Sequence, residues 1–310
     1  MSRTGEAGRG GRAFDGRRWR IAARTAGGIL RWVVLIEFIY VFLFPLLFMV
    51  ATSLKTVGEL NNPTVHWISR SPSLQAYEIA YTVLKYLEAI GISAATSVLA
   101  AVGQTLVGAM IAYGFARMRF PGRDFLFGVL LFSIVIPLQT VMIPQFILFT
   151  KLKWMNTYLP LIVPAWLGFG VRGGILLIVF RQFFRGLPYE LEDAAYVDGA
   201  GPLRTFGQIM LPLAKPGILV VFLFSLVWNW NDLFVPSMVL RKPELLTLPQ
   251  RMLAFVEWFL ATEQGLFGVY ELQENILMAG VTLTVIPMLV VYIFAQRYFT
   301  QSIDRTGLVE

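Results

Sequence analysis

Six long apolar stretches, separated by shorter polar segments, dominate the pattern of this chain. Each is about 20 residues long, which is the length that an α-helix needs to cross a bilayer core of about 30 Å. The first stretch is too long for a signal peptide, and no small-residue cleavage site follows it. The pattern therefore predicts an all-α integral membrane protein with six transmembrane helices, at Leu30–Ser53, Ala89–Ala112, Asp124–Ile143, Leu159–Phe180, Gly217–Val239 and Ile276–Ala295.

The distribution of Lys and Arg predicts the orientation of these helices. Of the 26 basic residues, 17 fall in the N-terminal tail, the 117–123 turn, the 181–216 loop and the C-terminal tail. Only 8 fall in the segments between them, and Arg172 lies inside the fourth predicted helix. Cytoplasmic segments carry the excess of Lys and Arg in multi-span proteins. Both termini and the 181–216 loop are therefore expected in the cytoplasm.

This orientation divides the chain into segments with different expected environments. We expect a basic, disordered cytoplasmic tail, a first transmembrane helix, an outer segment, a five-helix core with a cytoplasmic loop, and a cytoplasmic C-terminal tail. Their residues are 1–29, 30–53, 54–88, 89–297 with the loop at 181–216, and 298–310.

Composition agrees with a membrane protein and narrows the possible chemistry. The apolar fraction is 56% and the mean hydropathy is +0.65, above the values usual for a soluble domain. There is no Cys, so disulfides, thiolate chemistry and Cys-based zinc sites are not expected. A P-loop requires Gly-Lys-Ser/Thr, and no Gly-Lys dipeptide occurs. We expect neither an enzyme nor a bound metal or cofactor, and we expect any ATP hydrolysis to occur in a separate subunit.

The net charge of +7 is concentrated at the N-terminus. Through Arg31 the tail has 8 basic and 2 acidic residues. This is typical of a cytoplasmic flank that only sets the orientation, and it also suits contact with anionic lipid head groups. Nucleic-acid binding is not expected, because the remainder of the chain is nearly neutral and lies in the membrane.

The segment from Arg181 to Pro216 is a polar island that predicts two short helices joined at glycine. Pro188 suits the first position of a helix, and acidic residues fill the first turn, where the helix dipole favours them. Gly199 falls where a left-handed helix end is expected. The second helix is predicted to start at Pro202 and to break by Pro212. Small residues on one face of the first helix favour close approach of another protein, and this face consists of Leu191, Ala194 and Ala195.

The same residues resemble the cytoplasmic loop of the permease subunits of binding-protein-dependent ABC importers. That loop has Glu-Ala-Ala, three residues, Gly, nine residues, Ile, one residue and Leu-Pro. Every spacing is kept here, with Asp193-Ala194-Ala195, Gly199, Ile209 and Leu211-Pro212. Asp193 replaces the usual Glu and follows Glu192, so either carboxylate is a candidate for the partner contact. The surrounding sequence is similar to the carbohydrate branch, of the maltose-permease type, and the resemblance covers about two-thirds of the chain.

The resemblance implies a function and a set of partners. It implies a type I ABC importer permease fold in the plasma (inner) membrane of a prokaryote, moving a sugar or oligosaccharide. The implied partners are a second homologous permease subunit, two cytoplasmic ATP-binding subunits and an extracytoplasmic solute-binding protein. The 188–212 loop would couple the permease to the ATPase through Leu191, Glu192, Asp193, Ala194, Ala195, Gly199, Ile209, Leu211 and Pro212.

Polar residues inside the predicted helices are candidates for a translocation path. Alternating Trp and Asn near a carboxylate in the fifth helix suit sugar binding, because aromatic faces bind C–H patches and Asn or Asp binds hydroxyls. The same residues also suit contacts between helices and an aromatic belt at the membrane surface. An Arg in the fourth helix indicates either an ion pair or a role in the path. The candidates are Gln139, Arg172, Trp228, Asn229 and Asp232.

Two other transporter classes are alternatives to a sugar permease of an ABC importer. An ion-coupled secondary transporter would need carboxylates at the membrane midplane and often has an internal repeat. Asp232 is the only deep carboxylate, and no repeat is evident. An ABC permease for a solute other than a sugar remains the second alternative.

Overall fold

The structure is a computed structural model, and it describes residues 16–60, 62, 67–170, 172–263 and 274–306. All regular structure in these residues is helical, including one π-helix, η1, and one 3₁₀-helix, η2. In chain order the elements are α1 (Gly16–Ser53), α2 (Val57–Leu60), α3 (Gln75–Val83), α4 (Tyr86–Arg117), α5 (Arg123–Val135), α6 (Leu138–Lys151), α7 (Leu159–Trp166), α8 (Gly173–Arg185), α9 (Glu190–Val197), α10 (Pro202–Thr205), η1 (Phe206–Met210), α11 (Leu211–Leu213), α12 (Lys215–Trp230), α13 (Phe234–Val239), η2 (Pro243–Leu245), α14 (Leu248–Glu263) and α15 (Glu274–Thr306).

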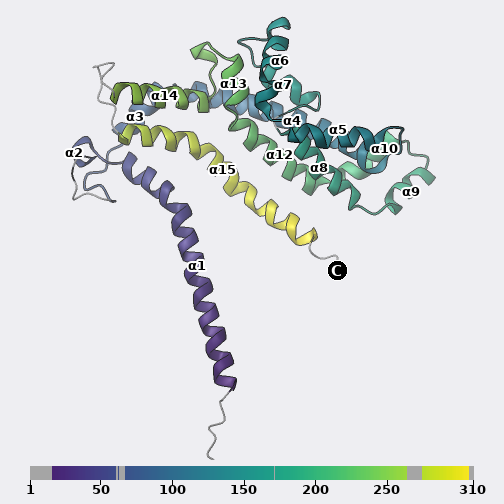
Figure 1. Cartoon of the computed structure of the whole chain (residues 1–310), viewed down its shortest axis with the longest axis horizontal. Helices are drawn as coiled ribbons and strands as arrows, with labels where there is room; N and C mark the ends of the chain where they lie inside the picture. Colours follow the sequence, from purple (N-terminus) through teal and green to yellow (C-terminus); the bar gives the residue numbers. More distant parts are fainter. Residues whose placement is uncertain (1–15, 61, 63–66, 171, 264–273, 307–310) are drawn as a thin grey trace, which may run out of the picture.

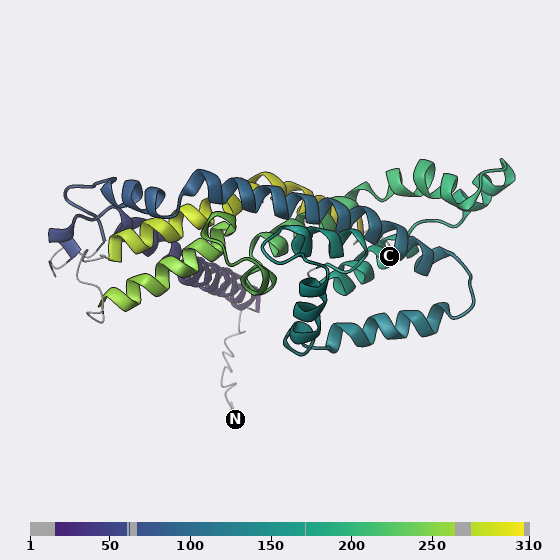
Figure 2. The same cartoon turned by 90° about the horizontal axis from the view of Figure 1, so that it is seen from above.

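Helix α4 runs along the centre of an elongated bundle and packs against α7, α8 and α12 (Figure 2). The side chains that α4 buries are mostly small, among them Ala100, Ala101, Ala109 and Ala112. Small residues allow helices to approach closely without a strong hydrophobic driving force, which is how helices associate in lipid.

The two ends of the bundle are built differently. Helices α2, α3 and α14 lie at one end, and α9 and α10 lie at the other (Figures 1 and 2). Helix α1 packs against α15 but extends away from the remaining helices, and most of its large apolar side chains are exposed (Figure 1). These exposed side chains are suited to lipid or to another membrane helix.

The Glu59 carboxylate organises the segment that follows α1. It accepts hydrogen bonds from the Ser69 hydroxyl (2.6 Å) and from the backbone N–H groups of Arg70 (2.7 Å) and Ser71 (3.1 Å). These bonds, with that of Ser69 first, lower the pKa of Glu59 to about 2. The carboxylate therefore stays ionised at neutral pH and links α2 to residues 69–71.

Three unbroken helices in the described residues are long and apolar enough to cross a membrane, at Gly27–Ser53, Tyr86–Arg117 and Glu274–Arg297. Two bent helix pairs qualify if each pair forms one span. They are α5 with α6, bent by 101°, and Pro202–Leu213 with α12, bent by 80°.

Three of the six predicted continuous helices are interrupted, so these predictions were wrong in their continuity. The third breaks at Pro137, which cannot donate a backbone hydrogen bond and holds Ile136 in an extended conformation. The fourth breaks between α7 and α8, where Gly168 (φ 81°) and Arg172 (φ 52°) are left-handed. The fifth ends at Trp230, and a new helix, α13, follows.

The predicted boundaries outside the membrane also need correction. The tail expected to be disordered over 1–29 is helical from Gly16, because α1 begins before the predicted first transmembrane helix. The tail at 298–310 is likewise helical as far as Thr306. The first loop helix begins at Glu190 rather than at Pro188. The second continues past Pro212 to Leu213, because the wider π-turn η1 precedes the proline that lacks a donor.

The contact between Gly103 and Trp166 yields a test of the central packing. A Cβ at Gly103 would overlap the Trp166 indole, whose Nε1–H donates to the Leu99 carbonyl (3.0 Å). Gly103→Ala should therefore destabilise the protein by about 1–3 kcal/mol, the usual cost of overpacking. Thermal unfolding of the purified protein in detergent measures this loss.

Gly114→Ala is the matched control, because Gly114 lies on the same helix and a Cβ there meets nothing within 4 Å. It should be neutral or stabilising by about 0.5–1 kcal/mol, since Ala is a better helix former. Equal stability of the two variants would contradict the close packing at Gly103.

Candidate functional site

The loop helix α9 has well-defined ends. Glu190, Glu192 and Asp193 occupy its first turn, as expected from the helix dipole. At its C-terminus Gly199 is left-handed (φ 80°) and donates to the Tyr196 carbonyl (3.0 Å), while Ala200 donates to the Ala195 carbonyl (2.9 Å). This pair of bonds is a Schellman motif. The helix end predicted at Gly199 is confirmed.

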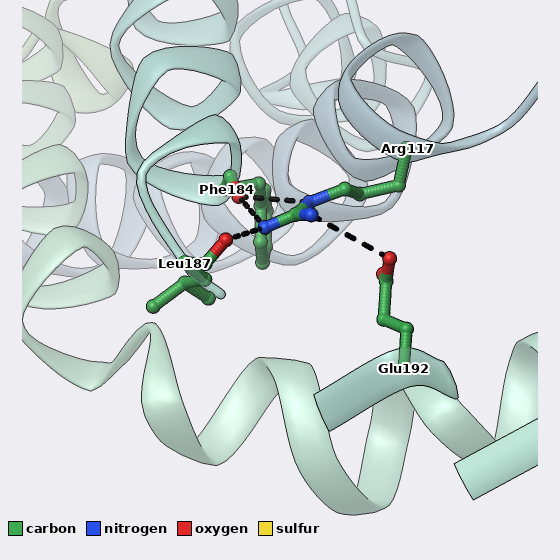
Figure 3. Close-up of polar contacts among 4 residues, drawn as sticks. All are labelled: Arg117, Phe184, Leu187 and Glu192. Carbon is green, nitrogen blue, oxygen red and sulfur yellow. Dashed lines mark hydrogen bonds and ion pairs between the residues drawn. The ribbon is translucent and has the colours of Figure 1, made fainter. Parts of the chain in front are cut away.

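Arg117, the last residue of α4, joins α9 to the bundle (Figure 3). Its guanidinium donates to the carbonyl of Phe184, at 2.9 Å from Nε and 2.6 Å from Nη2, and also to the carbonyl of Leu187. Nη1 lies 3.6 Å from Oε2 of Glu192, and the group stacks 4.0 Å from the centre of the Tyr189 ring. A single side chain thus connects the ends of α4 and α8 with α9.

Both members of this ion pair are buried, although Nη1 of Arg117 and Oε1 of Glu192 make no hydrogen bond within the described residues. The side chains of Arg117 and Glu192 are 1% and 7% exposed. A buried charge requires a partner and hydrogen bonds, and removing one member of a pair leaves the other uncompensated. The sequence interpretation treated Arg117 only as a basic residue of an inner turn. Its partner lies 75 positions further along the chain, and no local pattern links the two.

The predicted loop residues divide between an inner and an outer face. Glu192 and Ala195 are buried against the bundle, whereas Leu191, Asp193 and Ala194 are exposed. The expectation that Ala194 and Ala195 form one outer face was therefore wrong for Ala195. Adjacent residues of an α-helix point about 100° apart, and the tie to Arg117 fixes which side faces inward.

The second half of the loop mainly anchors it. Ile209 and Leu211 are half-buried against the cluster that contains Met210, Phe180 and Phe184, whereas Pro212 is exposed. The motif therefore combines an exposed helix with an apolar anchor in the bundle.

A cavity of about 650 Å³ lies where the three broken helices meet, between α4–α8 and the α12–α13 break. Among its polar side chains are Arg172, Asn229 and Asp232, together with Thr96 and Ser97 of α4. Three of the five predicted path residues are therefore brought to one cavity. Gln139 is exposed and does not line the cavity. Trp228 does not line it either, but its ring centre lies 5.0 Å from the guanidinium of Arg172.

The helix break at Asp232 is stabilised locally. Oδ1 of Asp232 accepts the backbone N–H of Phe234 (2.9 Å) at the start of α13. Asn229 lies on the last turn of α12 and donates to the Ser225 carbonyl (2.8 Å). Asn229 and Asp232 share the cavity although the helix ends between them.

Gln104 is a central polar residue that the sequence interpretation missed. It is 3% exposed, and its Oε1 accepts the Ser225 hydroxyl (2.5 Å) and lies 3.4 Å from Nδ2 of Asn229. A Cβ at Gly170 would lie 2.7 Å from the Gln104 amide. Gln104 therefore links α4 to α12 and to the α7–α8 break. The sequence did contain a signal for this role, because Gln104 is a lone amide among small apolar residues and such a group needs a hydrogen-bond partner inside a membrane.

Comparison with known proteins assigns the chain to a class. The sequence profile of the family described as "Binding-protein-dependent transport system inner membrane component" matches residues 104–305. The arabinooligosaccharides transport system permease protein AraQ of Halalkalibacterium halodurans is 32% identical over 291 residues, covering 92% of this chain and 99% of the relative. The diacetylchitobiose uptake system permease protein NgcG of Streptomyces coelicolor is 30% identical over 290 residues, covering 92% and 88%.

A solved structure has the same fold. A chain of a bacterial ABC transporter involved in import of the acidic polysaccharide alginate superposes with a TM-score of 0.75 at 20% sequence identity. The match covers 89% of this chain and 98% of the other.

The buried ion pair leads to a prediction about stability. Glu192→Ala would leave the Arg117 charge buried without a carboxylate, so we expect a loss of about 3–5 kcal/mol. The neighbouring Asp193 is exposed, and Asp193→Ala should change stability by no more than about 0.5 kcal/mol. Thermal unfolding of the two variants checks the difference, and equal unfolding temperatures would rule out the structural role of Glu192.

Proposed function

The chain belongs to the family of binding-protein-dependent transport system inner membrane components, and from this premise we propose that it is the permease subunit of an ATP-driven ABC importer for a sugar or oligosaccharide. The observation that carries the proposal is the match to sugar permeases along 92% of the chain, together with the family match over residues 104–305, which contains the whole loop from Asp193 to Pro212. The import is into a prokaryotic cell across its plasma (inner) membrane.

We propose six membrane spans with both termini in the cytoplasm. The third, fourth and fifth spans are broken helices, which is tolerated where the backbone is buried in protein or lines a cavity. The positions of the basic segments in the bundle support this orientation. The basic 117–123 and 181–216 segments lie at the end of the bundle with α9, while α3 and α14 lie at the opposite end (Figures 1 and 2).

The exposed side of α9 is proposed to dock on a cytoplasmic ATP-binding subunit. It presents Asp193 together with Leu191 (37% exposed) and Val197 (87% exposed), and Leu203 lies nearby on α10. A carboxylate with apolar neighbours suits a cleft that contains a basic residue. Glu192 is already engaged by Arg117, so of the two carboxylates that the motif offers, Asp193 is the one available to the partner.

Coupling is proposed to run from α9 through Arg117. When the ATPase subunits close on ATP, α9 would move as a rigid body. Since Arg117 binds α9 and also the end of α8, the motion would reach α4 and α8 together. These two helices line the cavity, α4 through Ser97 and α8 through Leu177, and Arg172 directly precedes α8. The cavity would then open to alternate sides of the membrane.

The proposed importer also requires a solute-binding protein and a second permease subunit. A solute-binding protein delivers the substrate from outside. A second homologous permease subunit would complete the path, and the exposed apolar side of α1 and of α15 offers surface for it or for lipid. The segments proposed are those expected from the sequence, namely the outer segment 54–88, the core 89–297 and the coupling loop 181–216.

Asp193 gives the test of the docking assignment. In the assembled importer, Asp193→Ala should lower sugar uptake and sugar-stimulated ATP hydrolysis about tenfold or more, because a charge-assisted hydrogen bond contributes about 1.5–3 kcal/mol. Asp193→Glu retains the carboxylate and should keep most of the activity. Normal uptake by Asp193→Ala would remove this residue from the interface, and failure of the purified chain to bind any P-loop ATPase would refute the function itself.

The cavity gives a second test, since the chain has no native Cys. Asn229→Cys should react with a water-soluble thiol reagent, and its rate should change between the ATP-bound and nucleotide-free importer. Trp230→Cys is the control, because Trp230 is 4% exposed and packs against Ala89 and Leu248. Protection of position 229 in every state would leave it as a contact between helices.

A further inference from the structure

Arg172 occupies an unusual place in the cavity. It directly precedes α8, at the break in the fourth span, and its backbone is left-handed (φ 52°). That conformation is uncommon outside glycine. It marks the point where the chain turns into α8, with the Arg172 side chain at the cavity.

Within the described residues, the Arg172 guanidinium has no carboxylate oxygen within 4.0 Å. It lies 5.0 Å from the centre of the Trp228 ring. Asp232 lines the same cavity, but its Oδ1 accepts the Phe234 N–H and holds the start of α13. The other charged group of the cavity is thus engaged in the protein backbone.

This arrangement suits the recognition of an anion. A guanidinium in a membrane segment is costly unless it faces water or an anion. An aromatic face beside the guanidinium favours its charge, while the N–H edge stays available for a planar anion. The fork of donors matches a carboxylate in a bidentate manner, which an ammonium does not do.

The remainder of the cavity suits a sugar. Its volume of about 650 Å³ falls within the range of about 300–1,000 Å³ that small-molecule sites occupy. Asn229, Thr96 and Ser97 line the cavity. The Asn229 amide N–H and the Thr96 hydroxyl donate to Ser225 and Ile92, so these two residues offer their oxygens as acceptors for sugar hydroxyls.

We propose that Arg172 makes this cavity selective for acidic saccharides, by binding a carboxylate of the sugar as it passes. The proposal rests on the proposed function and narrows its substrate class. The sugar hydroxyls face Asn229 and the α4 hydroxyls, and the carboxylate faces Arg172.

The test uses the assembled importer without its solute-binding protein, so that binding reports on the permease cavity. The probes are α-1,4-digalacturonate and its neutral counterpart, α-1,4-digalactose, measured by calorimetry. The unmodified importer should bind the acidic sugar about tenfold more tightly, which is the scale of one charge-assisted contact. Arg172→Gln should reduce this preference to within about twofold, and Arg172→Lys should keep an intermediate preference.

Arg241→Gln is the matched control. Arg241 also lies over an aromatic ring, 6.0 Å from the centre of Phe146, but it does not line the cavity. This variant should keep the full preference for digalacturonate. A loss of the same size at Arg241 would overturn the proposal, because the preference would then reflect overall charge.

Three further results would overturn the proposal. The first is equal binding of the two sugars by the unmodified importer. The second is an unchanged preference in Arg172→Gln. The third is dissociation of the second permease subunit from Arg172→Gln but not from Arg172→Lys, which would assign Arg172 to an ion pair between subunits.

ATP hydrolysis is measured on the same samples. Coupled uptake of a neutral sugar without acidic preference would refute only this inference, whereas absence of an associated ATPase would refute the proposed function.

Discussion

The close approach of neighbouring helices to α4 is the constraint on which the rest of the structure depends. Helix α4 contacts α7, α8 and α12, and its small side chains bring these backbones near one another. Gly103 leaves room for the Trp166 indole, and Gln104 can then reach Ser225 on α12. At the end of the same helix, Arg117 reaches the carbonyls of α8 and the carboxylate of α9. The central packing, the cavity and the position of the loop helix α9 therefore all depend on contacts made by α4.

The three interrupted helices form a cavity because they end inside the bundle. A helix that stops within a membrane leaves backbone groups that water cannot satisfy, so protein groups must do so. Asp232 accepts the Phe234 N–H at one break, and Gln104 lies against Gly170 at another. Each break also places a polar side chain at the space between helix ends. In this protein, the interruptions of helical structure and the polar character of the cavity have the same origin.

In the acidic first turn of α9, two adjacent carboxylates lie in different environments. Glu192 points inward and joins a buried ion pair, whereas Asp193 points outward. A buried pair contributes geometric definition more than stability, since removing one member costs much more than the pair adds. Arg117 therefore links the loop helix α9 to the bundle. The exposed face of α9 remains available for another protein.

The sequence by itself determined the helical class, the membrane environment and the place of the loop. Length and apolarity identify spans because a bilayer core has a fixed thickness, and the helix end at Gly199 and the acidic turn follow from local backbone chemistry. The sequence also singled out Arg172, Asn229 and Asp232, because polar groups are conspicuous in apolar stretches. It did not predict the breaks at Gly168 and Asn231, since apolarity measures the length of a segment and not the continuity of its helix. Tertiary structure alone decided that Arg117 binds Glu192 and that Gln104 binds Ser225. Those partners are 75 and 121 positions apart, and only the packing around α4 brings them within reach.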